Sequence, residues 1–561
     1  MASTAHTTAS GTIYHPAETF DIPRLDLLSL LFDSKCTDSQ EDTVIHASAA
    51  NPSIALTKAE LRTQTRRTAH MLRSTYGIGA NGPNKDIVTV VSTGSQFVPL
   101  LFYGIIAAGG VFSAVSPAST TSELARLIST AGSKCIICNE ATKDLTIQAA
   151  GEADLPYDSV CVISEGATWS VRKLGHEQNL ITTQELDWQR ITDLKTLEES
   201  LIVLIYSSGT TGLPKGVCLS HTNLVSEAVV TLELTKKRYK IVGKENFQYR
   251  TLAHLPIAHI AGIQGYFINP FYMNGTTYWM SKFSFPEFLE YNKKYRITFF
   301  FTVPPIYLLI AKSPLVKDHF DTLEHAVSGA APLGKELQYA ASAKLGKGKT
   351  FVSQTWGLSE TTGSITAMPY GLNDDTGSVS SLVPNCYARV VDETEKDVPV
   401  GERGELWVKG PVVTKGYYSN ADANADAYTD GWFRTGDIGY FANGLFYCVD
   451  RMKELIKYKG LQVAPAELEA LLLTHPLIAD AAVIGITTED GTNELPRAYV
   501  VADNSAISEM DIKDWVATKV AGHKQLRGGV VFVDVIPKSP SGKILRKDLR
   551  ALAKRVDGAK L

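Results

Sequence analysis

A run of small and hydroxylated side chains that ends in a lysine is the part of the sequence best suited to chemistry. It reads Tyr206-Ser-Ser-Gly-Thr-Thr-Gly-Leu-Pro-Lys-Gly216 and follows an apolar stretch, SLIVLI, that predicts a buried strand. Exposed backbone N–H groups, hydroxyls and the Lys215 ammonium can together surround phosphate oxygens. It is not a Walker A motif, because the Gly–Lys spacing differs and no Ser or Thr follows Lys215. The run therefore predicts a phosphate-binding loop of another kind, with a flexible surface turn as the alternative.

The sequence does not support the other catalytic or nucleotide-binding motifs that we considered. Gly77-Ile-Gly79-Ala-Asn-Gly82 matches G-x-G-x-x-G, but a helical segment precedes it and a strand follows, the reverse of the dinucleotide-binding order. We interpret it as a helix-to-strand loop. The sequence holds no G-x-S-x-G elbow, and His254 and His259 lack the H-E-x-x-H pattern, so serine hydrolase and zincin functions have no support.

The composition excludes several classes of protein. The 561 residues are 44% hydrophobic and 20% charged, and 55 basic against 59 acidic side chains give a formal net charge of −4. This is typical of a globular protein and excludes disordered, collagen-like and disulfide-scaffold chains. It also argues against nucleic acid as a partner, because no chain-wide positive field is present. The seven cysteines are odd in number and scattered, which indicates a reducing compartment.

Two apolar stretches need a structural interpretation. Cys135 and Cys138 form a C-x-x-C that flanks two isoleucines, which favours a buried strand over a redox or metal site. Residues 97–115 carry no charge and nearly reach transmembrane length. Pro99 and the Gly109-Gly110 pair interrupt them, so we expect a buried helix followed by a buried strand and no membrane span.

The elements that must position the loop alternate along the chain. Apolar β-rich runs at 86–92, 133–139, 200–208 and 297–303 lie between helix-like segments, which predicts an α/β fold with a doubly wound parallel sheet. Short strands with Gly-rich turns between about 370 and 450 indicate an antiparallel, β-barrel-like part. The basic run KKRYK at 236–240 is expected in a solvated loop.

A separate small α+β domain is expected over residues 451–561, after a larger domain at 1–450. Its predicted elements are a helix at 465–474, strands at 480–486 and 496–502, a helix at 509–520 and a strand at 529–535. Residues 538–561 hold eight basic and two acidic side chains. They predict either a solvated amphipathic helix or a surface that faces a polyanionic ligand.

Five further motifs follow the phosphate loop in a fixed order. They are Gly329-Ala-Ala-Pro-Leu333, Gln354-Thr-Trp-Gly-Leu-Ser-Glu-Thr-Thr362, Gly431-Trp-Phe-Arg-Thr-Gly-Asp437, Asp450-Arg-Met-Lys453 through Ala464-Pro-Ala-Glu467, and Pro540-Ser-Gly-Lys-Ile-Leu-Arg546. Taken together, from about residue 40 to 550, the chain resembles the adenylate-forming superfamily of acyl-CoA ligases, luciferases and peptide-synthetase adenylation domains. KELIKYKGLQVAPAELE is most similar to the 4-coumarate-CoA ligase and luciferase branch.

The resemblance implies ATP, Mg²⁺ and coenzyme A, and an acid–thiol ligase that passes through an acyl-adenylate. Lys543 would bridge the α-phosphate and the substrate carboxylate, where a cation stabilises the charge that accumulates on phosphate. Glu360 would bind Mg²⁺, since a carboxylate suits a hard cation. The other implied nucleotide contacts are Ser207, Ser208, Gly209, Thr210, Thr211, Gly212 and Lys215 for the β- and γ-phosphates, Ser359 for the α-phosphate, Gly329, Ala330, Ala331, Pro332, Thr355 and Trp356 around the adenine, and Asp437 with Arg451 at the ribose.

The second half-reaction would use the small domain again after a rotation. Lys453 matches the hinge, and rotation would withdraw Lys543 and bring Lys457, Gly460 and Gln462 to the site for attack by the coenzyme A thiol. His259 matches a gate on the thiol tunnel. A hydrogen-bonded core histidine is the alternative for that residue.

Two departures from the coumarate ligases bear on the substrate. Thr355-Trp356-Gly357 stands where those enzymes have Gly-Tyr-Gly, and Ala261 replaces a tyrosine that recognises the phenol ring. We therefore expect an aryl-alkanoic or medium-chain aliphatic acid rather than 4-coumarate. The pocket residues predicted for it are Ala261, Gly262, Gly265, Val303 and Thr355.

The last three residues, Ala559-Lys560-Leu561, are close to the S-K-L peroxisomal address and predict a peroxisomal enzyme bound by an import receptor, with the cytoplasm as the alternative. Two other functions stay open at this point. One is a stand-alone adenylating enzyme that loads a carrier protein or, like luciferase, oxidises its adenylate. The other is a non-catalytic nucleotide-binding protein.

Overall fold

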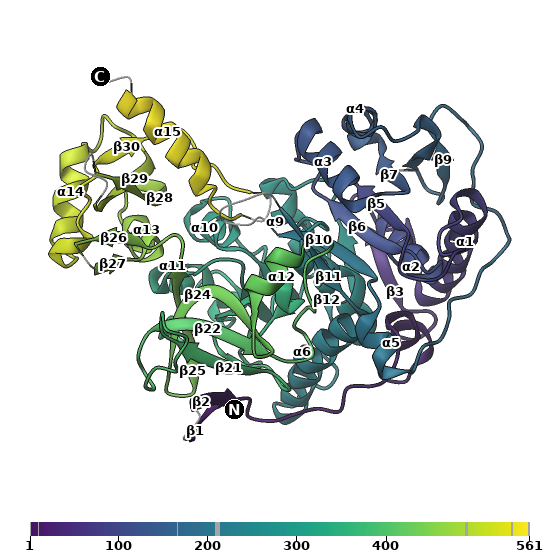
Figure 1. Ribbon diagram of the computed structural model, residues 1–561, viewed down its shortest axis with the longest axis horizontal. Helices are drawn as coiled ribbons and strands as arrows, with labels where there is room; N and C mark the ends of the chain where they lie inside the picture. The colour runs from purple at the N-terminus through teal and green to yellow at the C-terminus, as the bar shows by residue number, and fades with distance from the viewer. Residues whose placement is uncertain are drawn as a thin grey trace.

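The computed structural model describes residues 2–8, 11–164, 166–207, 214–459, 461–488, 492–539 and 542–558. Ser208 to Gly212 and Gly460, which the sequence placed in the site, lie outside these ranges, as does the Ala559–Leu561 tripeptide. Peroxisomal location therefore stays a prediction. The described chain is an α/β protein with a large N-terminal part and a smaller C-terminal part, and this confirms the predicted fold class (Figure 1).

A seven-stranded sheet with the order β11-β10-β6-β5-β7-β8-β9 lies in the N-terminal part, and its five inner strands are parallel. Helices α1 (Lys58–Tyr76) and α2 (Val98–Ala107) share a core with one face, while α3 (Thr121–Ala131) and α4 (Lys143–Glu152) cover the other. Because both faces are covered, β5, β6 and β7 are buried throughout. The doubly wound prediction is confirmed. The strands are β5 (Ile87–Val91), β6 (Val111–Val115), β7 (Cys135–Asn139), β8 (Val160–Ile163), β9 (Val171–Lys173), β10 (Val203–Ser207) and β11 (Lys215–Leu219).

Both apolar stretches have the predicted structure. Residues 97–115 form α2 and β6, separated by a turn in which Gly109 has a φ of 77°. Among the described residues, no helix is both long and apolar enough to cross a membrane. Cys135 and Cys138 are buried on β7, and burial raises the pKa of the Cys138 thiol to about 12. The C-x-x-C motif is therefore part of a strand that holds neutral thiols.

The G-x-G-x-x-G match is a helix-to-strand loop, as predicted. Gly77 ends α1 in the left-handed conformation with a φ of 63°, and the chain then enters β5. A β-carbon at Gly79 would lie 2.0 Å from the carbonyl oxygen of Ala108. These glycines are thus explained by helix termination and close backbone packing.

An antiparallel sheet occupies the region where the sequence predicted a β-barrel-like part. It contains β21 (Tyr387–Val391), β22 (Gly404–Lys409), β23 (Tyr428–Thr429), β24 (Trp432–Ala442) and β25 (Leu445–Arg451). Two N-terminal strands, β1 (Thr4–Thr8) and β2 (Gly11–His15), extend it, with Tyr14 opposite Ala388. No local sequence pattern indicated this hairpin, because Tyr14 pairs with Ala388, which is far away along the chain.

Two further sheets and a long helix also lie in the N-terminal part. The sheets are β12-β13-β3-β4 and the parallel β14-β15-β16, and α6 (His221–Ile241) packs beside them. The loop predicted for KKRYK at 236–240 is wrong: these residues form the last turns of α6. Tyr239 is buried, and Lys236 pairs with Asp38 at 2.9 Å, so the helix continues. The remaining bounds are β3 (Val44–Ser48), β4 (Ala55–Thr57), β12 (Arg250–Ala253), β13 (Thr276–Trp279), β14 (Phe299–Thr302), β15 (His325–Ser328), β16 (Val352–Gln354), α9 (Phe285–Lys294), α10 (Pro304–Lys312) and α11 (Lys335–Ser342).

The C-terminal part has its own apolar cores and lies to one side of the molecule (Figure 1). The helices and strands predicted for it are present, although α14 and β30 are shorter than expected. The boundary predicted at 450/451 falls at the end of β25. Its elements are β26 (Ile456–Tyr458), β27 (Leu461–Val463), α13 (Pro465–Leu473), β28 (Ile478–Thr487), β29 (Glu494–Ala502), α14 (Glu509–Ala517), β30 (Val530–Phe532) and α15 (Arg546–Gly558).

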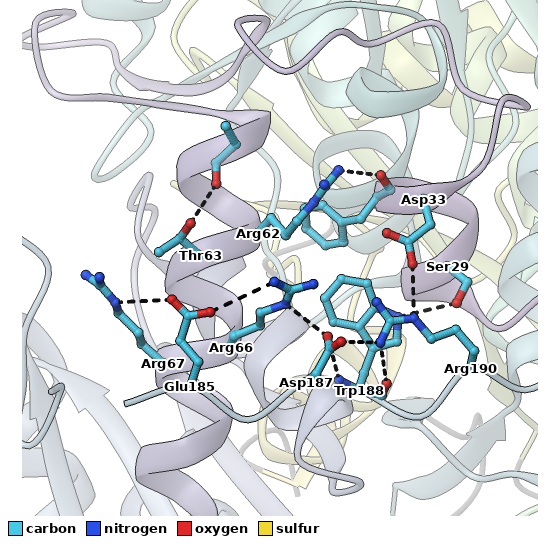
Figure 2. A network of polar contacts seen from close by, with 12 residues as sticks. Ser29, Asp33, Arg62, Thr63, Arg66, Arg67, Glu185, Asp187, Trp188 and Arg190 are labelled. Carbon is cyan, nitrogen blue, oxygen red and sulfur yellow. Dashed lines mark hydrogen bonds and ion pairs between the residues drawn. The ribbon is translucent and has the colours of Figure 1, made fainter. Parts of the chain in front are cut away.

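A polar network fastens the irregular segment 176–193 to α1 (Figure 2). Asp187 accepts from Arg66 Nε at 2.9 Å and also pairs with Arg190. The guanidinium carbons of Arg66 and Arg190 lie 5.3 and 4.4 Å from the Trp188 ring centre, which is a cation–π arrangement. Trp188 is buried, and its indole N–H donates to Ser29 Oγ at 3.3 Å. We call Arg66, Asp187, Trp188 and Arg190 the Trp188 clamp.

Candidate active site

A cavity of about 920 Å³ brings together residues from the phosphate loop, from the motifs at 329–333, 354–362 and 450–453, and from the Lys543 motif. Its walls come from the end of β10, from α6, from the segment after His259 and from the C-terminal part of the chain. The predicted site residues that line it are Ser207, His259, Ala261, Gly265, Gly329, Ala330, Thr355, Ser359, Glu360, Arg451 and Lys543.

A second cavity of about 800 Å³ adjoins the first, and Ala330, Thr355, Arg451 and Lys543 line both. Its other predicted residues are Ala331, Pro332, Trp356 and Asp437. The residues expected around adenine and ribose therefore lie next to those expected around the phosphates. Lys215, Gly262, Val303, Lys453, Lys457 and Gln462 line neither cavity.

Lys543 reaches the first cavity on a short hairpin that precedes α15. An antiparallel bridge joins Lys538 to Ile544, and the Lys543 backbone N–H donates to Ser539 Oγ at 3.1 Å. Burial lowers the pKa of Lys543, and the positive charge of Arg451 lowers it further. The fold thus holds two cations close together in a cavity, an arrangement that an anionic ligand would stabilise.

Gly542 allows this hairpin to pack closely against the N-terminal part. It has a φ of 79°, and a β-carbon there would lie 3.1 Å from Val303 Cγ2 and 3.2 Å from Pro305 Cγ. Val303 was predicted to line the acyl pocket, but it is buried in a core and faces this glycine. It therefore supports the position of Lys543 from behind.

Asp437, Arg451 and Trp356 form one hydrogen-bonded group. Asp437 and Arg451 are paired across β24 and β25, which places Arg451 Nε 2.7 Å from Asp437 Oδ1. The Trp356 indole N–H donates to Asp437 Oδ2, also at 2.7 Å. Asp437 raises the pKa of Arg451. Each carboxylate oxygen keeps a second lone pair, so the group can still accept hydrogen bonds from two hydroxyls.

Glu360 is buried on the short helix η6 (Ser359–Thr361) and receives a hydrogen bond that the sequence analysis missed. Tyr417 O–H donates to Glu360 Oε1 at 3.0 Å, and Lys215 Nζ lies 4.9 Å from the centre of the Tyr417 ring. Tyr417 thereby links the far end of the phosphate loop to Glu360, although Lys215 itself lies outside the cavity walls. Nothing in its spacing indicated this role, because Tyr417 lies 57 residues after Glu360 and belongs to none of the motifs.

The Glu360 carboxylate is the type of ligand that Mg²⁺ prefers. Within the described residues there is no cluster of three or more His, Cys, Asp or Glu side chains that could hold a metal ion. A magnesium ion here would therefore depend on phosphate oxygens and water for its other ligands, as is usual for nucleotide-bound magnesium.

His259 caps a helix and also faces the cavity. Its Nδ1 accepts from the backbone N–H of Ala261 at 3.2 Å, at the start of α7 (Ile260–Gly262). Burial lowers its pKa to about 4, and Lys543 adds a smaller repulsion, so the ring is neutral at pH 7. With Nδ1 as acceptor, the proton lies on Nε2. Both expectations for this residue, a gate and a hydrogen-bonded histidine, remain compatible with that geometry.

Two of the residues predicted for the thiol step, Lys457 and Gln462, lie away from both cavities. Lys457 and Gln462 face each other across β26 and β27 and are exposed, and the Lys457 backbone N–H donates to Glu494 Oε2 at 2.9 Å. The structure therefore places Lys543, and not Lys457, at the site.

The acyl region differs in part from the prediction. Ala261, Gly265 and Thr355 line the first cavity, but Gly262 does not, since a β-carbon there would meet the Pro256 carbonyl oxygen at 2.5 Å. The wall that the sequence analysis missed is one stripe of α6, formed by Glu227, Thr231, Thr235 and Tyr239. Their four-residue spacing puts them on one helix face, but only tertiary packing shows that this face is a cavity wall.

Comparison with known protein families identifies the family to which this chain belongs. The family model described as "AMP-binding enzyme" matches residues 32–418, and "AMP-binding enzyme C-terminal domain" matches residues 467–543. The chain belongs to the AMP-binding enzyme family. This places it in the adenylate-forming superfamily and confirms the predicted acyl-CoA synthetase branch.

Three similar proteins show how closely this AMP-binding enzyme matches its relatives. A protein of Emericella nidulans named "Putative acyl-coenzyme A synthetase" is 50% identical over 553 residues, covering 97% of this chain and 99% of that protein. "Phenylacetyl-CoA ligase epaB" of Aspergillus niger is 33% identical, covering 94% and 96%. The crystal structure of ATP-bound MatB from Rhodopseudomonas palustris is 27% identical and superposes with a TM-score of 0.80, covering 95% and 99%.

Family membership assigns the reaction class. This AMP-binding enzyme is an AMP-forming acid–thiol ligase that uses ATP and coenzyme A. Lys543, Glu360 and Arg451 of this enzyme line one cavity.

Proposed function

We propose that the protein activates an aryl-alkanoic or medium-chain carboxylic acid with ATP and Mg²⁺ and transfers the acyl group to coenzyme A. The observation that carries the proposal is the position of Lys543, which lies in the same cavity as Glu360 and Arg451 although it comes from the C-terminal part of the chain. A non-catalytic protein would have no need to hold a lysine whose pKa burial and Arg451 both lower.

The first step joins an oxygen of the substrate carboxylate to the α-phosphorus of ATP. The bond from that phosphorus to the bridging oxygen breaks, and pyrophosphate leaves with the electron pair. Lys543 stabilises the negative charge that develops on the α-phosphate, and Asp437, Arg451 and Trp356 together orient the nucleoside. Glu360 would hold Mg²⁺, which neutralises charge on the phosphates when bound.

The second step breaks the acyl–phosphate bond. The coenzyme A sulfur attacks the acyl carbon, AMP leaves, and the thiol proton passes to solvent or to a neighbouring base. Lys457 and Gln462 would serve this step after the C-terminal part turns, because they lie outside the site in the present arrangement. Neutral His259, at the cavity wall, could then line the path of the thiol.

The shape of the cavity supports an elongated acid. It follows α6 from Glu227 to Tyr239, and twelve residues of helix span about 18 Å. Ala261 and Gly265, which also line the cavity, have small side chains that add little bulk. The name of the Aspergillus niger relative, a phenylacetyl-CoA ligase, agrees with the aryl-alkanoic part of the proposal.

The test is pyrophosphate release with ATP and Mg²⁺ across benzoic, phenylacetic, cinnamic and straight-chain fatty acids, each with and without coenzyme A. We expect release that depends on an arylalkanoic or medium-chain acid and rises with coenzyme A. Release that is indifferent to coenzyme A would contradict the thiol transfer. Activity confined to benzoic acid would contradict the proposed substrate class.

A further inference from the structure

The stretch of the cavity at the start of α6 contains two buried polar groups that the adenylation chemistry does not use. Glu227, on α6, is 4% exposed, and Gln264, on η4 (Ile263–Ile268), is 7% exposed. Both line the first cavity. Each has one side-chain oxygen that contacts no hydrogen-bonding group in the described part of the protein, namely Glu227 Oε2 and Gln264 Oε1.

Glu227 is oriented by its other oxygen. Oε1 accepts from the backbone N–H of Ser364 at 2.9 Å, and a β-carbon at the neighbouring Gly363 would lie only 2.9 Å from it. Burial raises the pKa of Glu227 well above its ordinary value and so favours the protonated carboxyl over the carboxylate. Because Oε1 accepts a hydrogen bond, the proton is assigned to Oε2. Glu227 therefore presents a hydrogen-bond donor to the cavity.

Gln264 presents the complementary acceptor. Its Nε2 donates to the Leu224 carbonyl oxygen at 3.4 Å, which assigns Oε1 as the free end of the amide. Leu224 and Glu227 are three residues apart on α6, so the Gln264 head group lies on the side of the helix that carries Glu227. A donor and an acceptor thus face the same part of the cavity.

The positions of the basic residues in the cavity wall restrict the type of ligand group that could bind beside Glu227 and Gln264. The basic residues in the cavity wall are Arg451, Lys538 and Lys543, which come from the end of β25 and from the hairpin before α15. None of them opposes the effect of burial on Glu227. A second carboxylate would therefore find no cation beside Glu227, whereas a neutral group that both donates and accepts would pair with both residues.

We propose that Glu227 and Gln264 form a subsite that recognises a hydroxyl group on the acyl part of the substrate, so that the preferred acid is a hydroxy acid. The hydroxyl accepts from Glu227 Oε2–H and donates to Gln264 Oε1. This inference rests on the proposed acid–thiol ligase function and specifies its substrate. It makes Glu227 and Gln264 specificity residues that touch the substrate away from the reacting carboxylate.

The experiment compares octanoic acid with its 3-, 5- and 8-hydroxy derivatives, and phenylpropanoic acid with its para-hydroxy derivative. The measurement is kcat/KM for pyrophosphate release. We expect the native enzyme to prefer at least one hydroxylated acid by roughly tenfold or more, since a site built to pair a hydroxyl rejects the analogue without it. The preferred position maps the distance from the carboxylate to Glu227. Equal values for hydroxylated and plain acids would overturn the subsite.

Three variants separate recognition from folding. Glu227→Leu is expected to abolish the preference, so that the ratio of kcat/KM for the hydroxylated acid to kcat/KM for the plain acid falls to about one. Glu227→Gln is expected to retain it, because its amide can accept from Ser364 and donate to the hydroxyl. Glu233→Leu is the matched control: Glu233 lies on the same helix outside the cavity and accepts from Tyr272 O–H at 2.6 Å, so the preference should persist. Loss of preference in the control, or its survival in Glu227→Leu, would contradict the proposal.

Failure of the ligase function can be told apart from failure of the subsite. If no acid supports pyrophosphate release, the proposed function is wrong. Binding of the same acid pairs, followed by the shift in melting temperature that each produces, still tests the subsite. A larger shift with a hydroxylated acid, lost in Glu227→Leu, would support it, and equal shifts would overturn it.

Discussion

The Trp188 clamp and the active-site cavity use charged residues in opposite ways. In the clamp, Arg66 and Arg190 both pair with Asp187, the two guanidinium groups flank the Trp188 ring, and the three charged side chains are a quarter to a half exposed. In the cavity, Lys543 lies near Arg451, a group of like charge, and one oxygen of Glu227 has no hydrogen-bond partner among the residues that the structure describes. Satisfied polar groups fasten chain segments together, whereas incompletely satisfied buried groups indicate where a ligand completes the structure.

The largest effect should come from removing the cation in the cavity. In Lys543→Ala, carboxylate-dependent ATP–pyrophosphate exchange should fall about 10²–10³-fold, because a preorganised charge at the α-phosphate is lost. Thioester formation from supplied acyl-adenylate should be largely spared. The melting temperature should hold or rise, since the fold disfavours this charge. Lys547→Ala, an exposed lysine on α15, is the control, and an equal loss in both half-reactions would contradict the role of Lys543.

A substitution in the Trp188 clamp should lower the stability of the protein and leave its activity unchanged. Trp188→Ala should lower the free energy of unfolding by about 3–5 kcal/mol, the usual loss for a buried aromatic side chain. The kcat/KM of the protein that remains folded should be unchanged, because the clamp lies away from the cavity walls. Chemical denaturation followed by tryptophan fluorescence measures the first quantity. A selective fall in kcat/KM without loss of stability would remove the distinction between the two regions.

Lowering the pH should reduce the stability of the folded protein, because two histidines that line the cavity are held neutral by burial. Burial lowers the pKa of His259 and His325 to about 4, so the unfolded chain binds protons below pH 6.5 that the folded chain does not. The free energy of unfolding should therefore fall as the pH drops from 6.5 to 4, by about 3 kcal/mol for each such histidine. His325→Phe should reduce that slope in melting curves recorded across this pH range. An unchanged slope would mean that His325 is protonated in the folded protein.

The smallest effect is expected from the exposed ion pairs of the clamp. Asp187→Asn removes the carboxylate that pairs with Arg66 and Arg190, but exposed pairs contribute only about 1 kcal/mol or less. The change in melting temperature should shrink further at high salt, because ions screen such pairs. A loss as large as that of Trp188→Ala would show that the charges, rather than the indole, fasten the segment.

The sequence was informative where function depends on residue type and local order. The alternation of apolar runs and helices predicted the doubly wound sheet, and the order of the motifs identified the superfamily. Asp437, Trp356, Glu360 and Lys543 were each named from a short motif, and the structure places all four at the two adjoining cavities. Local signals also explain the Gly77 helix end and the buried strand around Cys135.

It was less informative where a residue acts through a distant partner. Tyr417, the α6 stripe and the β1–β2 hairpin carry no motif, and each acquires its role by contact with a segment far away along the chain. Val303 is the converse case, a residue that was predicted to line the site but that the fold places elsewhere. Its apolar side chain suited an acyl pocket, but packing turned it toward Gly542 instead.

The sequence by itself determined the family, the α/β architecture and the side chains available for phosphate chemistry, because these depend on periodicity and on functional groups close together in the chain. Only the tertiary structure decided that Lys543 rather than Lys457 occupies the site and that Asp437 holds both Arg451 and Trp356. It also decided that Glu227 and Gln264 line one cavity, each with one side-chain oxygen that has no hydrogen-bond partner among the described residues. These outcomes depend on which surfaces are brought together and desolvated. Burial and direct contact, not sequence spacing, set the charge and the hydrogen-bonding capacity of each group.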